Sequence, residues 1–315
     1  KGNFVICFLP MQVGFLITNY KATKLATEAV QALRKYEPAS PIVVVDNCTP
    51  LSTEDVEHFQ SFGNVAVVQN PRNLGYSASV NIGFRTLADC DIVFIHDADA
   101  LATMPISEPL LAEARHHREI GVWGFKLVDR QGRPTGNASP SRTPMELLLG
   151  PLAERAMSMP SLRFLFPERP LGIHSCAMAV RHEVWERVNG FDENFELLES
   201  DIEFCYRVEK ELGLRAQVID NIVLIHEGGA TPLGRSQRMI SWHCASMRFF
   251  NKHKLIKHPR LFKLGLFGRH ATELIITAIG GRLLWPDKWT RNDRLRYRWR
   301  LLTGVFNDYR DGRLL

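Results

Sequence analysis

The amino-acid sequence predicts an α/β domain with a mainly parallel sheet, followed by a basic helical region. Apolar runs rich in β-branched residues recur through the first 100 residues, segments with helical spacing separate them, and basic residues accumulate toward the C-terminus. The chain has 315 residues, of which 45% are hydrophobic. This is enough to bury a substantial core.

Strands and helices alternate between residues 13 and 100. We expect buried strands at 13–19, 41–45, 65–69 and 91–95, with helices at 21–36, 53–62 and 77–87. In sheets of this kind the ligand lies beyond the carboxyl ends of the strands. The polar residues at the expected strand ends are Thr18, Asn19, Asp46, Asn47, Asn70, Asn73, Asp97 and Asp99.

The pattern is looser after residue 100. Further strands are expected at 120–127 and 178–180, a turn at 130–136 and a short helix at 183–188. Residues 137–170 are rich in Pro, Ser, Met and Leu and are expected to form an excursion or a flap. From about residue 236 onward the chain is expected to be helical.

The charge distribution is asymmetric. Residues 248–315 carry 16 Lys/Arg and 5 Asp/Glu, whereas residues 1–247 carry 23 and 29. Basic residues interleaved with aromatics, including Trp285, Trp289 and Trp299, are typical of helices at an anionic membrane surface. The alternative is that the apolar residues pack on the body while Lys and Arg face water. No nucleic-acid-binding motif accompanies the charge, so nucleic acid is not an expected partner.

Cysteine usage and the chain start indicate the compartment. The six cysteines form no CxxC pair or zinc-like spacing, so we expect reduced core residues. We find no secretory signal and no run of the roughly 18–20 apolar residues that a membrane span needs. We therefore expect a cytoplasmic protein, peripheral at the inner face of the plasma membrane. Residues 1–11 are left open as an extra strand or added sequence.

Asp97 and Asp99 form the first candidate site. Two carboxylates two residues apart after a buried strand project the same way and can hold a hard divalent cation. Such a cation neutralises charge on a leaving diphosphate. The alternative is a solvated turn or helix cap.

The segment from Asp46 to Gly83 offers groups for a nucleotide. Asp46 can accept hydrogen bonds from a nucleobase or ribose, although Asp-Asn is also good turn chemistry. In Asn70–Gly83, Gly75 permits close backbone approach, the following helix start can bind phosphate, and Arg72 adds charge. The alternative is an ordinary loop-to-helix junction. The segment is neither a Walker loop nor a GxGxxG fingerprint.

Two further residues carry candidate chemistry. Asp201, in the acidic cluster Glu199–Glu203, can act as a general base, although acids at a helix start are also favourable electrostatically. His226 follows an apolar run and precedes Glu227, Gly228 and Gly229. It can complete a metal site or be purely structural.

Together these segments resemble family 2 of the glycosyltransferases, which have the GT-A fold, and especially its rhamnosyltransferase-like branch. The resemblance spans about residues 13–253. It rests on FLITNY (15–20), VVVDN (43–47), NLGYSASVNIGF (73–84), DIVFIHDADA (91–100), MAVRHEVWERVNGFDENF (178–195), SDIEFCYR (200–207) and VLIHEGGAT (223–231).

The resemblance implies a GT-A, Rossmann-like mixed sheet flanked by helices. The catalytic domain would span residues 1–235, with a donor half at about 13–100 and an acceptor half at about 101–235. Residues 236–315 would form the basic helical region. The implied metal is Mg²⁺ or Mn²⁺.

The resemblance also implies roles for individual residues. Asp201 would be the general base of an inverting reaction, and His226 would lie near the metal and diphosphate. The implied metal ligands are Asp97, Asp99 and His226. The implied donor-binding residues are Thr18, Asn19, Asp46, Arg72, Asn73, Gly75 and Asp97, and His174, Ser175 and Glu199 face the acceptor.

The segments 127–144 and 241–253 resemble the rhamnosyltransferase-like branch and favour a thymidine diphosphate-linked deoxysugar such as L-rhamnose. A uridine-linked hexose or N-acetylhexosamine is the alternative. The acceptor would be a cell-envelope glycan or a polyprenyl-diphosphate-linked saccharide.

Two departures concern the acceptor side. Ser200 replaces the Glu of the family's Glu-Asp pair, although Glu199 precedes it, and the stretch Ser175–Ala177 lacks a frequent glycine. Rival interpretations are a non-catalytic scaffold, a dehydrogenase, a nucleotidyltransferase and a membrane-binding module. The retained acids and His226 argue against the scaffold. The missing glycine fingerprint and phosphate loop argue against the next two.

Overall fold

A computed structural model describes residues 11–150, 159, 169–195, 197–228, 234–284 and 291–309. The expectations for residues 1–10, Gly229, Trp285 and Trp289, and for most of 151–168, fall outside this range. The chain forms two compact units, each described separately below. The larger unit draws on Lys1–Ser139, Pro170–Asn194 and Ser200–Ala230, and the smaller on Pro140–Arg169, Phe195–Glu199 and Thr231–Leu315.

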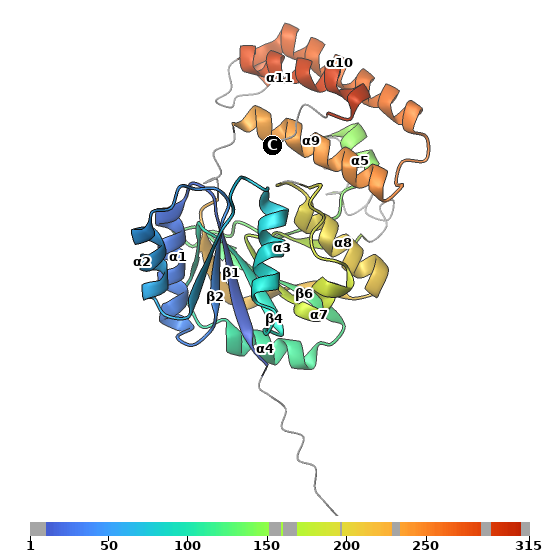
Figure 1. The fold of residues 1–315 in the computed structure, drawn as a ribbon. Helices are drawn as coiled ribbons and strands as arrows, with labels where there is room; N and C mark the ends of the chain where they lie inside the picture. Colours follow the sequence, from blue (N-terminus) through green and yellow to red (C-terminus); the bar gives the residue numbers. More distant parts are fainter. Residues whose placement is uncertain are drawn as a thin grey trace, which may run out of the picture. The chain divides into compact units, whose positions relative to one another are not determined.

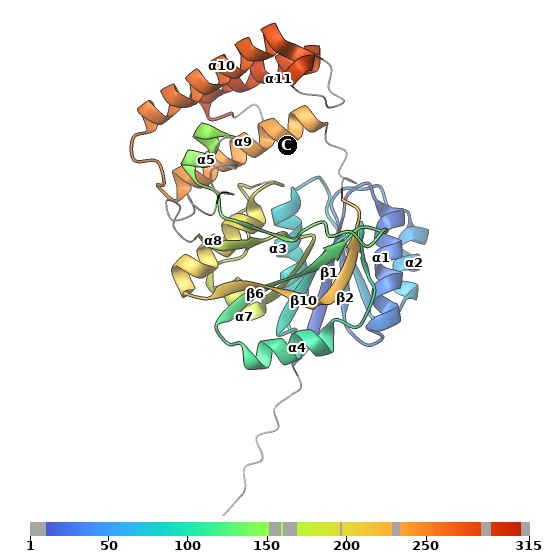
Figure 2. The ribbon, with the colours of Figure 1, turned by 180° about the vertical axis from the view of Figure 1, so that it is seen from behind.

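The larger unit is built on a mixed sheet with strand order β3-β2-β1-β4-β9-β6-β10-β5 (Figure 1 and Figure 2). β7 and β8 form a separate short pair. The strands are β1 Val13–Asn19, β2 Ile42–Asp46, β3 Val65–Gln69, β4 Ile92–Asp97, β5 Ala100–Ala102, β6 Ile120–Val128, β7 Ala138–Pro140, β8 Leu171–Ile173, β9 Ala177–Arg181 and β10 Arg215–His226.

The sheet is mixed, as the resemblance implied, and among its described strands four pairings are parallel and three antiparallel, which agrees with the mainly parallel sheet that the strand–helix alternation predicted. β1 to β4 run parallel, but β9 lies antiparallel between β4 and β6, and β5 lies antiparallel on β10. Both antiparallel strands lie from residue 100 onward, where strand direction depends on long-range pairing that local periodicity does not encode.

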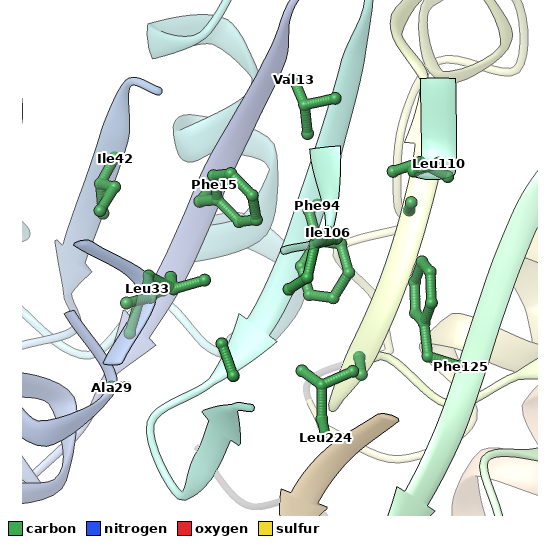
Figure 3. Packing of buried hydrophobic residues seen from close by; sticks show 14 of the residues in the cluster. Val13, Phe15, Ala29, Leu33, Ile42, Phe94, Ile106, Leu110, Phe125 and Leu224 are labelled. Atoms are coloured by element: carbon green, nitrogen blue, oxygen red, sulfur yellow. The ribbon is translucent and has the colours of Figure 1, made fainter. Parts of the chain in front are cut away.

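Helices cover both faces of the sheet. Alternate residues of β1 point to opposite faces: Phe15 belongs to a core that includes residues of α1, α2 and α4, whereas Leu16 belongs to a core that includes residues of α3, α7 and α8. Figure 3 shows the first of these two cores. The helices are α1 Thr23–Tyr36, α2 Thr53–Ser61, α3 Tyr76–Thr86, α4 Ser107–His116, α7 His182–Arg187 and α8 Ser200–Leu212.

The smaller unit is helical, as expected for the C-terminal region. Its long helices α10 and α11 pack against each other (Figure 1). Within the described residues, no helix is both long and apolar enough to cross a bilayer. The elements are α5 Pro144–Leu149, α9 Arg235–Lys252, α10 Pro259–Leu284, α11 Arg291–Gly304 and the 3₁₀ turn Val305–Asn307.

Cysteine burial follows the expectation in part. Cys90, Cys205 and Cys244 are buried, whereas Cys48 is exposed in the loop after β2. The prediction of core cysteines is wrong for Cys48, because this residue lies in a surface turn with positive φ.

Candidate active site

Strand register brings the predicted polar strand ends to one edge of the sheet. Asn19 is paired with Asp46 across β1 and β2, and Thr18 with Asp97 across β1 and β4. The chain runs from β1 to β2 and β3 on one side of β1, then places β4 on the other side. Such a reversal of strand order marks the crevice in which open α/β sheets bind ligands.

Asp46 forms a buried polar group at this edge. Its carboxylate accepts hydrogen bonds from Asn19 Nδ2 at 2.7 Å and from the Thr49 backbone N–H at 2.9 Å. Burial raises the pKa of Asp46, and the bonds from Thr49 and Asn19 oppose that change. The group is therefore held in place with hydrogen-bonding capacity at the strand end.

The loop after β3 is fixed by asparagines. Asn47 Nδ2 donates to Asn73 Oδ1 at 2.7 Å, and Asn47 Oδ1 accepts from the Leu74 backbone N–H at 2.8 Å. Gly75 caps α3 with φ 88°, a conformation that favours glycine. Arg72 is exposed. These contacts bring the N-terminus of α3, where backbone N–H groups can bind an anion, next to the loop after β2.

Asp97, Asp99 and His226 converge at the ends of β4 and β10. They offer ligand atoms that all lie within 4.8 Å of one another. His226 Nε2 is 3.4 Å from Asp99 Oδ1, because antiparallel pairing of β5 with β10 places His226 opposite Ala100. The spacing of Asp97 and Asp99 predicted their shared position, and the place of His226 after an apolar run had made it a candidate to complete a metal site.

Burial and close charges shift the pKa values of this cluster. Burial, followed by the neighbouring Asp99 carboxylate, raises the pKa of Asp97 to about 7. The hydrogen bond with Asp99 raises the pKa of His226. His96 precedes Asp97 in β4 and is buried, and this burial lowers the pKa of His96 to about 4. Two crowded carboxylates beside an imidazole form a donor set suited to a divalent cation, because an added positive charge relieves their repulsion.

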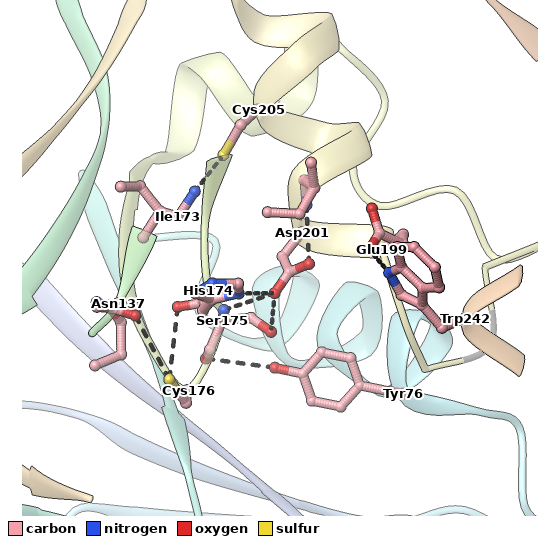
Figure 4. A network of polar contacts seen from close by, with 12 residues as sticks. Tyr76, Asn137, Ile173, His174, Ser175, Cys176, Glu199, Asp201, Cys205 and Trp242 are labelled. Atoms are coloured by element: carbon pink, nitrogen blue, oxygen red, sulfur yellow. Dashed lines mark hydrogen bonds and ion pairs between the residues drawn. The ribbon is translucent and has the colours of Figure 1, made fainter. Parts of the chain in front are cut away.

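Asp201 is held at the start of α8 by the loop before β9 (Figure 4). Its Oδ2 accepts from the Ser175 backbone N–H at 3.0 Å and from Ser175 Oγ at 3.3 Å, and His174 Nδ1 lies 3.8 Å away. Its Oδ1 accepts from the Ile202 N–H at 2.8 Å. The next residue of the same loop, Cys176, accepts a hydrogen bond from the Asp97 backbone N–H at 3.1 Å. The carboxylate therefore has a fixed orientation beside the acidic cluster.

Two positioning residues were not predicted. Tyr76 Oη donates to the Ser175 carbonyl at 3.4 Å, so α3 braces the same loop. At Gly172 in β8, a Cβ would lie 2.3 Å from Ile202 Cδ1 and 3.2 Å from Ile202 Cα, so only glycine lets β8 approach the first turn of α8. An aromatic after Gly75 was the available sequence signal for Tyr76, whereas Gly172 gave none.

Glu199 lies in the smaller unit, next to the start of α8 in the chain. It has φ 65° and is buried. Its carboxylate accepts from Trp242 Nε1 at 2.8 Å and pairs with Arg142 at 3.6 Å. These contacts give Glu199 a structural role in that unit, and its acceptor-side role stays a prediction.

A family of known sequences and several solved structures resemble this chain. The sequence model described as Glycosyl transferase family 2 matches residues 15–187, more than half of the chain. The fold, a mixed sheet flanked by helices, is that of the GT-A glycosyltransferases. The chain belongs to glycosyl transferase family 2 and is a glycosyltransferase.

Individual relatives are distant. The N-acetylglucosaminyl-diphospho-decaprenol L-rhamnosyltransferase of Mycobacterium tuberculosis is 25% identical over 208 residues, covering 60% of this chain and 68% of that protein. The crystal structure of S. aureus TarS 1-349 has TM-score 0.52 and 16% identity, covering 95% of this chain and 81% of that one. The structure of GalNAc-T7 with UDP, GalNAc and Mn²⁺ has TM-score 0.56 and 12% identity, covering 94% and 56%.

Proposed function

We propose that this enzyme is an inverting glycosyltransferase that moves a sugar from a nucleoside diphosphate to a hydroxyl of a glycan acceptor. The carrying observation is the loop before β9, where Ser175 donates to the Asp201 carboxylate and the next residue, Cys176, accepts from the Asp97 backbone N–H at 3.1 Å. This arrangement sets a candidate base beside a candidate diphosphate site, as a single displacement at the anomeric carbon requires.

The donor would lie along the carboxyl edge of β1, β2 and β4. Asp46, positioned by Asn19, would accept hydrogen bonds from the base or ribose, with Thr18 beside it. Asn73, Gly75 and the exposed Arg72 would flank the phosphates. The register that aligns these strand ends supports this assignment.

Asp97, Asp99 and His226 would hold a divalent cation, Mg²⁺ or Mn²⁺. Their ligand atoms meet within 4.8 Å, and the raised pKa of Asp97 reflects crowded negative charge that a cation would offset. When bound, the cation would neutralise the charge that develops on the leaving diphosphate. The structure of GalNAc-T7 with UDP, GalNAc and Mn²⁺ has a similar fold and supports this proposal.

Asp201 would remove the proton from the acceptor hydroxyl. Ser175 holds Oδ2 by two hydrogen bonds, and Ile202 N–H holds Oδ1, so the carboxylate is oriented before the acceptor arrives. The deprotonated oxygen would attack the anomeric carbon from the face opposite the diphosphate, inverting its configuration. His174 and Glu199 remain proposed acceptor-side residues.

The favoured donor is thymidine diphosphate-L-rhamnose, and the acceptor a cell-envelope glycan or polyprenyl-diphosphate-linked saccharide. The Mycobacterium tuberculosis relative, an N-acetylglucosaminyl-diphospho-decaprenol L-rhamnosyltransferase by name, supports L-rhamnose as the sugar and a polyprenyl-diphosphate-linked saccharide as the acceptor. A UDP-hexose or UDP-N-acetylhexosamine is the alternative, supported by the UDP and GalNAc in the GalNAc-T7 structure. We place the reaction in the cytoplasm, at the inner face of the plasma membrane.

The test is transfer by Asp201→Asn, with Asp220→Asn as the matched control. Asp220 is an exposed carboxylate on β10, so its neutralisation should leave transfer unchanged. Loss of a general base lowers turnover by roughly 10²–10⁴-fold, and donor binding should stay near the wild-type value. NMR of the wild-type product should show an inverted anomeric centre. Near-wild-type turnover by Asp201→Asn would overturn the proposal.

A further inference from the structure

The outward face of α10 is apolar along its described length. The exposed fractions of Leu261, Leu264, Ile275, Ile276 and Ile279 range from 39% to 84%. Their spacing follows one stripe of a helix, and Gly265, Gly268 and Thr272 fill the positions between them without adding charge. The opposite side of α10 is buried, with Leu266, His270 and Thr277 facing the interior of the unit. We call the outward stripe Leu261–Ile279 the α10 stripe.

An exposed stripe of this kind is unusual for a helix facing water. Surface helices place charged or polar residues on the solvent side, and contiguous exposed apolar patches mark binding surfaces. The charged residues of α10 that the structure describes lie off the stripe. Lys263 pairs with Asp308, and Arg269 pairs with Glu273.

The surroundings of the α10 stripe are basic. Lys254, Lys257 and Arg260 are exposed at the start of α10. On α11 the exposed residues include Arg296, Arg300 and Trp299.

Glu273 and Asp308, two of the three described acids from residue 259 onward, form ion pairs. Glu273 is paired with both Arg269 and Arg298, Asp308 is paired with Lys263, and the third, Asp293, is exposed in the first turn of α11. The exposed residues of α10, of the segment before it and of α11 therefore combine an apolar stripe with an excess of basic side chains.

We propose that the α10 stripe is a docking surface for an anionic lipid bilayer, with α10 lying in the plane of the interface. The apolar side chains would enter the acyl boundary, and Lys257, Arg260, Arg296 and Arg300 would meet lipid headgroups. A second copy of the chain fits less well, because it would bring one set of exposed basic side chains against another. The charged residues Lys263, Arg269 and Glu273 on the other sides of α10 suit a helix that lies on a membrane rather than one that crosses it.

The experiment is flotation of the full-length protein with vesicles of phosphatidylcholine and phosphatidylglycerol, and with phosphatidylcholine alone. The test variant carries Leu264→Gln, Ile275→Gln and Ile279→Gln, since glutamine preserves helix propensity while removing the apolar surface. The matched control is Met239→Gln, an exposed apolar residue on α9. A charge variant carries Arg296→Gln and Arg300→Gln, and its control carries the exposed pair Arg85→Gln and Arg187→Gln.

Wild-type protein should float with the anionic vesicles and release as salt rises. Each glutamine should weaken the partition coefficient by about tenfold, while Met239→Gln and the Arg85/Arg187 control stay near wild type. The Arg296/Arg300 variant should lose preference for the anionic vesicles.

Three results would overturn the proposal. These are absence of wild-type flotation, equal flotation of the triple glutamine variant, and a wild-type dimer that the triple variant dissociates without any vesicle binding. Sugar transfer to a short water-soluble acceptor should be unchanged in the triple variant. The docking proposal can therefore fail while the proposed transferase activity stands, and the proposed activity can fail while docking stands.

Discussion

Replacing Arg207 by methionine should strongly destabilise the larger unit, because Arg207 neutralises a buried carboxylate on the helix that carries Asp201. Glu203 is fully buried and Arg207 is 7% exposed. Arg207 Nε donates to both Glu203 oxygens at 2.9 Å, Nη2 donates to the Gly190 carbonyl at 2.7 Å, and Nη1 donates to the Val188 carbonyl. The guanidinium thus ties α8 to the loop after α7.

The magnitude follows from burial. Removing one partner of a buried ion pair costs about 3–5 kcal/mol. Both Arg207→Met and the double variant Glu203→Leu/Arg207→Met lose the donors to the two carbonyls, at about 1–3 kcal/mol each, but only Arg207→Met also leaves the Glu203 carboxylate buried without its partner. We therefore expect the double variant to be more stable than Arg207→Met alone.

The assay is urea unfolding followed by circular dichroism, with Lys210→Met as control. Lys210 is exposed on the same helix, so its change should stay within about 0.5 kcal/mol. The reasoning is refuted if Arg207→Met costs less than about 1 kcal/mol, or if the double variant is less stable than Arg207→Met.

Three further predictions follow from the geometry. Gly172→Ala should push Ile202 and the first turn of α8 away from β8 and lower the free energy of unfolding by about 1–3 kcal/mol. It should lower the turnover rate more than the donor affinity. Unchanged kinetics would show that Gly172 does not position Asp201. Asp99→Asn should weaken Mn²⁺ binding roughly tenfold or more in calorimetry, because ligand charge sets affinity at such sites; unaltered affinity would place the metal elsewhere. Burial and then His270 lower the pKa of His243 from 6.5 to about 3. Between these values the unfolded chain binds the proton and the folded chain does not, so the free energy of unfolding should fall as pH drops below 6.5, and His243→Gln should flatten that dependence in urea titrations at several pH values.

Local signals predicted the first half of the fold well. The four buried strands up to Asp97 were placed within two residues, because apolar runs bounded by polar strand ends carry a clear period. Helix α4 was missed, since its start depends on a distant residue: Glu37 Oε1 accepts from the Ile106 and Ser107 N–H groups at 2.6 and 2.9 Å. Only three-dimensional folding reveals that cap.

The candidate site was predicted to the extent that it lies at strand ends. Asp46 and the Asp97/Asp99 pair follow from the alternation of strands and helices alone, because parallel strands end at one edge. The contacts of Asp201 with Ser175, and the approach of Gly172 to α8, depend on β8 and β9 returning to the sheet. Neither spacing nor composition encodes that return.

The most direct test of the central claim is calorimetric titration of the wild-type protein with thymidine, uridine and guanosine diphosphates, with and without Mg²⁺ or Mn²⁺. The account predicts metal-dependent binding, tightest for thymidine diphosphate, and loss of that binding when Asp99 and His226 are both replaced. If uridine diphosphate binds most tightly, the donor is instead a UDP-hexose or UDP-N-acetylhexosamine. Absence of binding by all three nucleotides with metal present would contradict a donor site at this edge of the sheet.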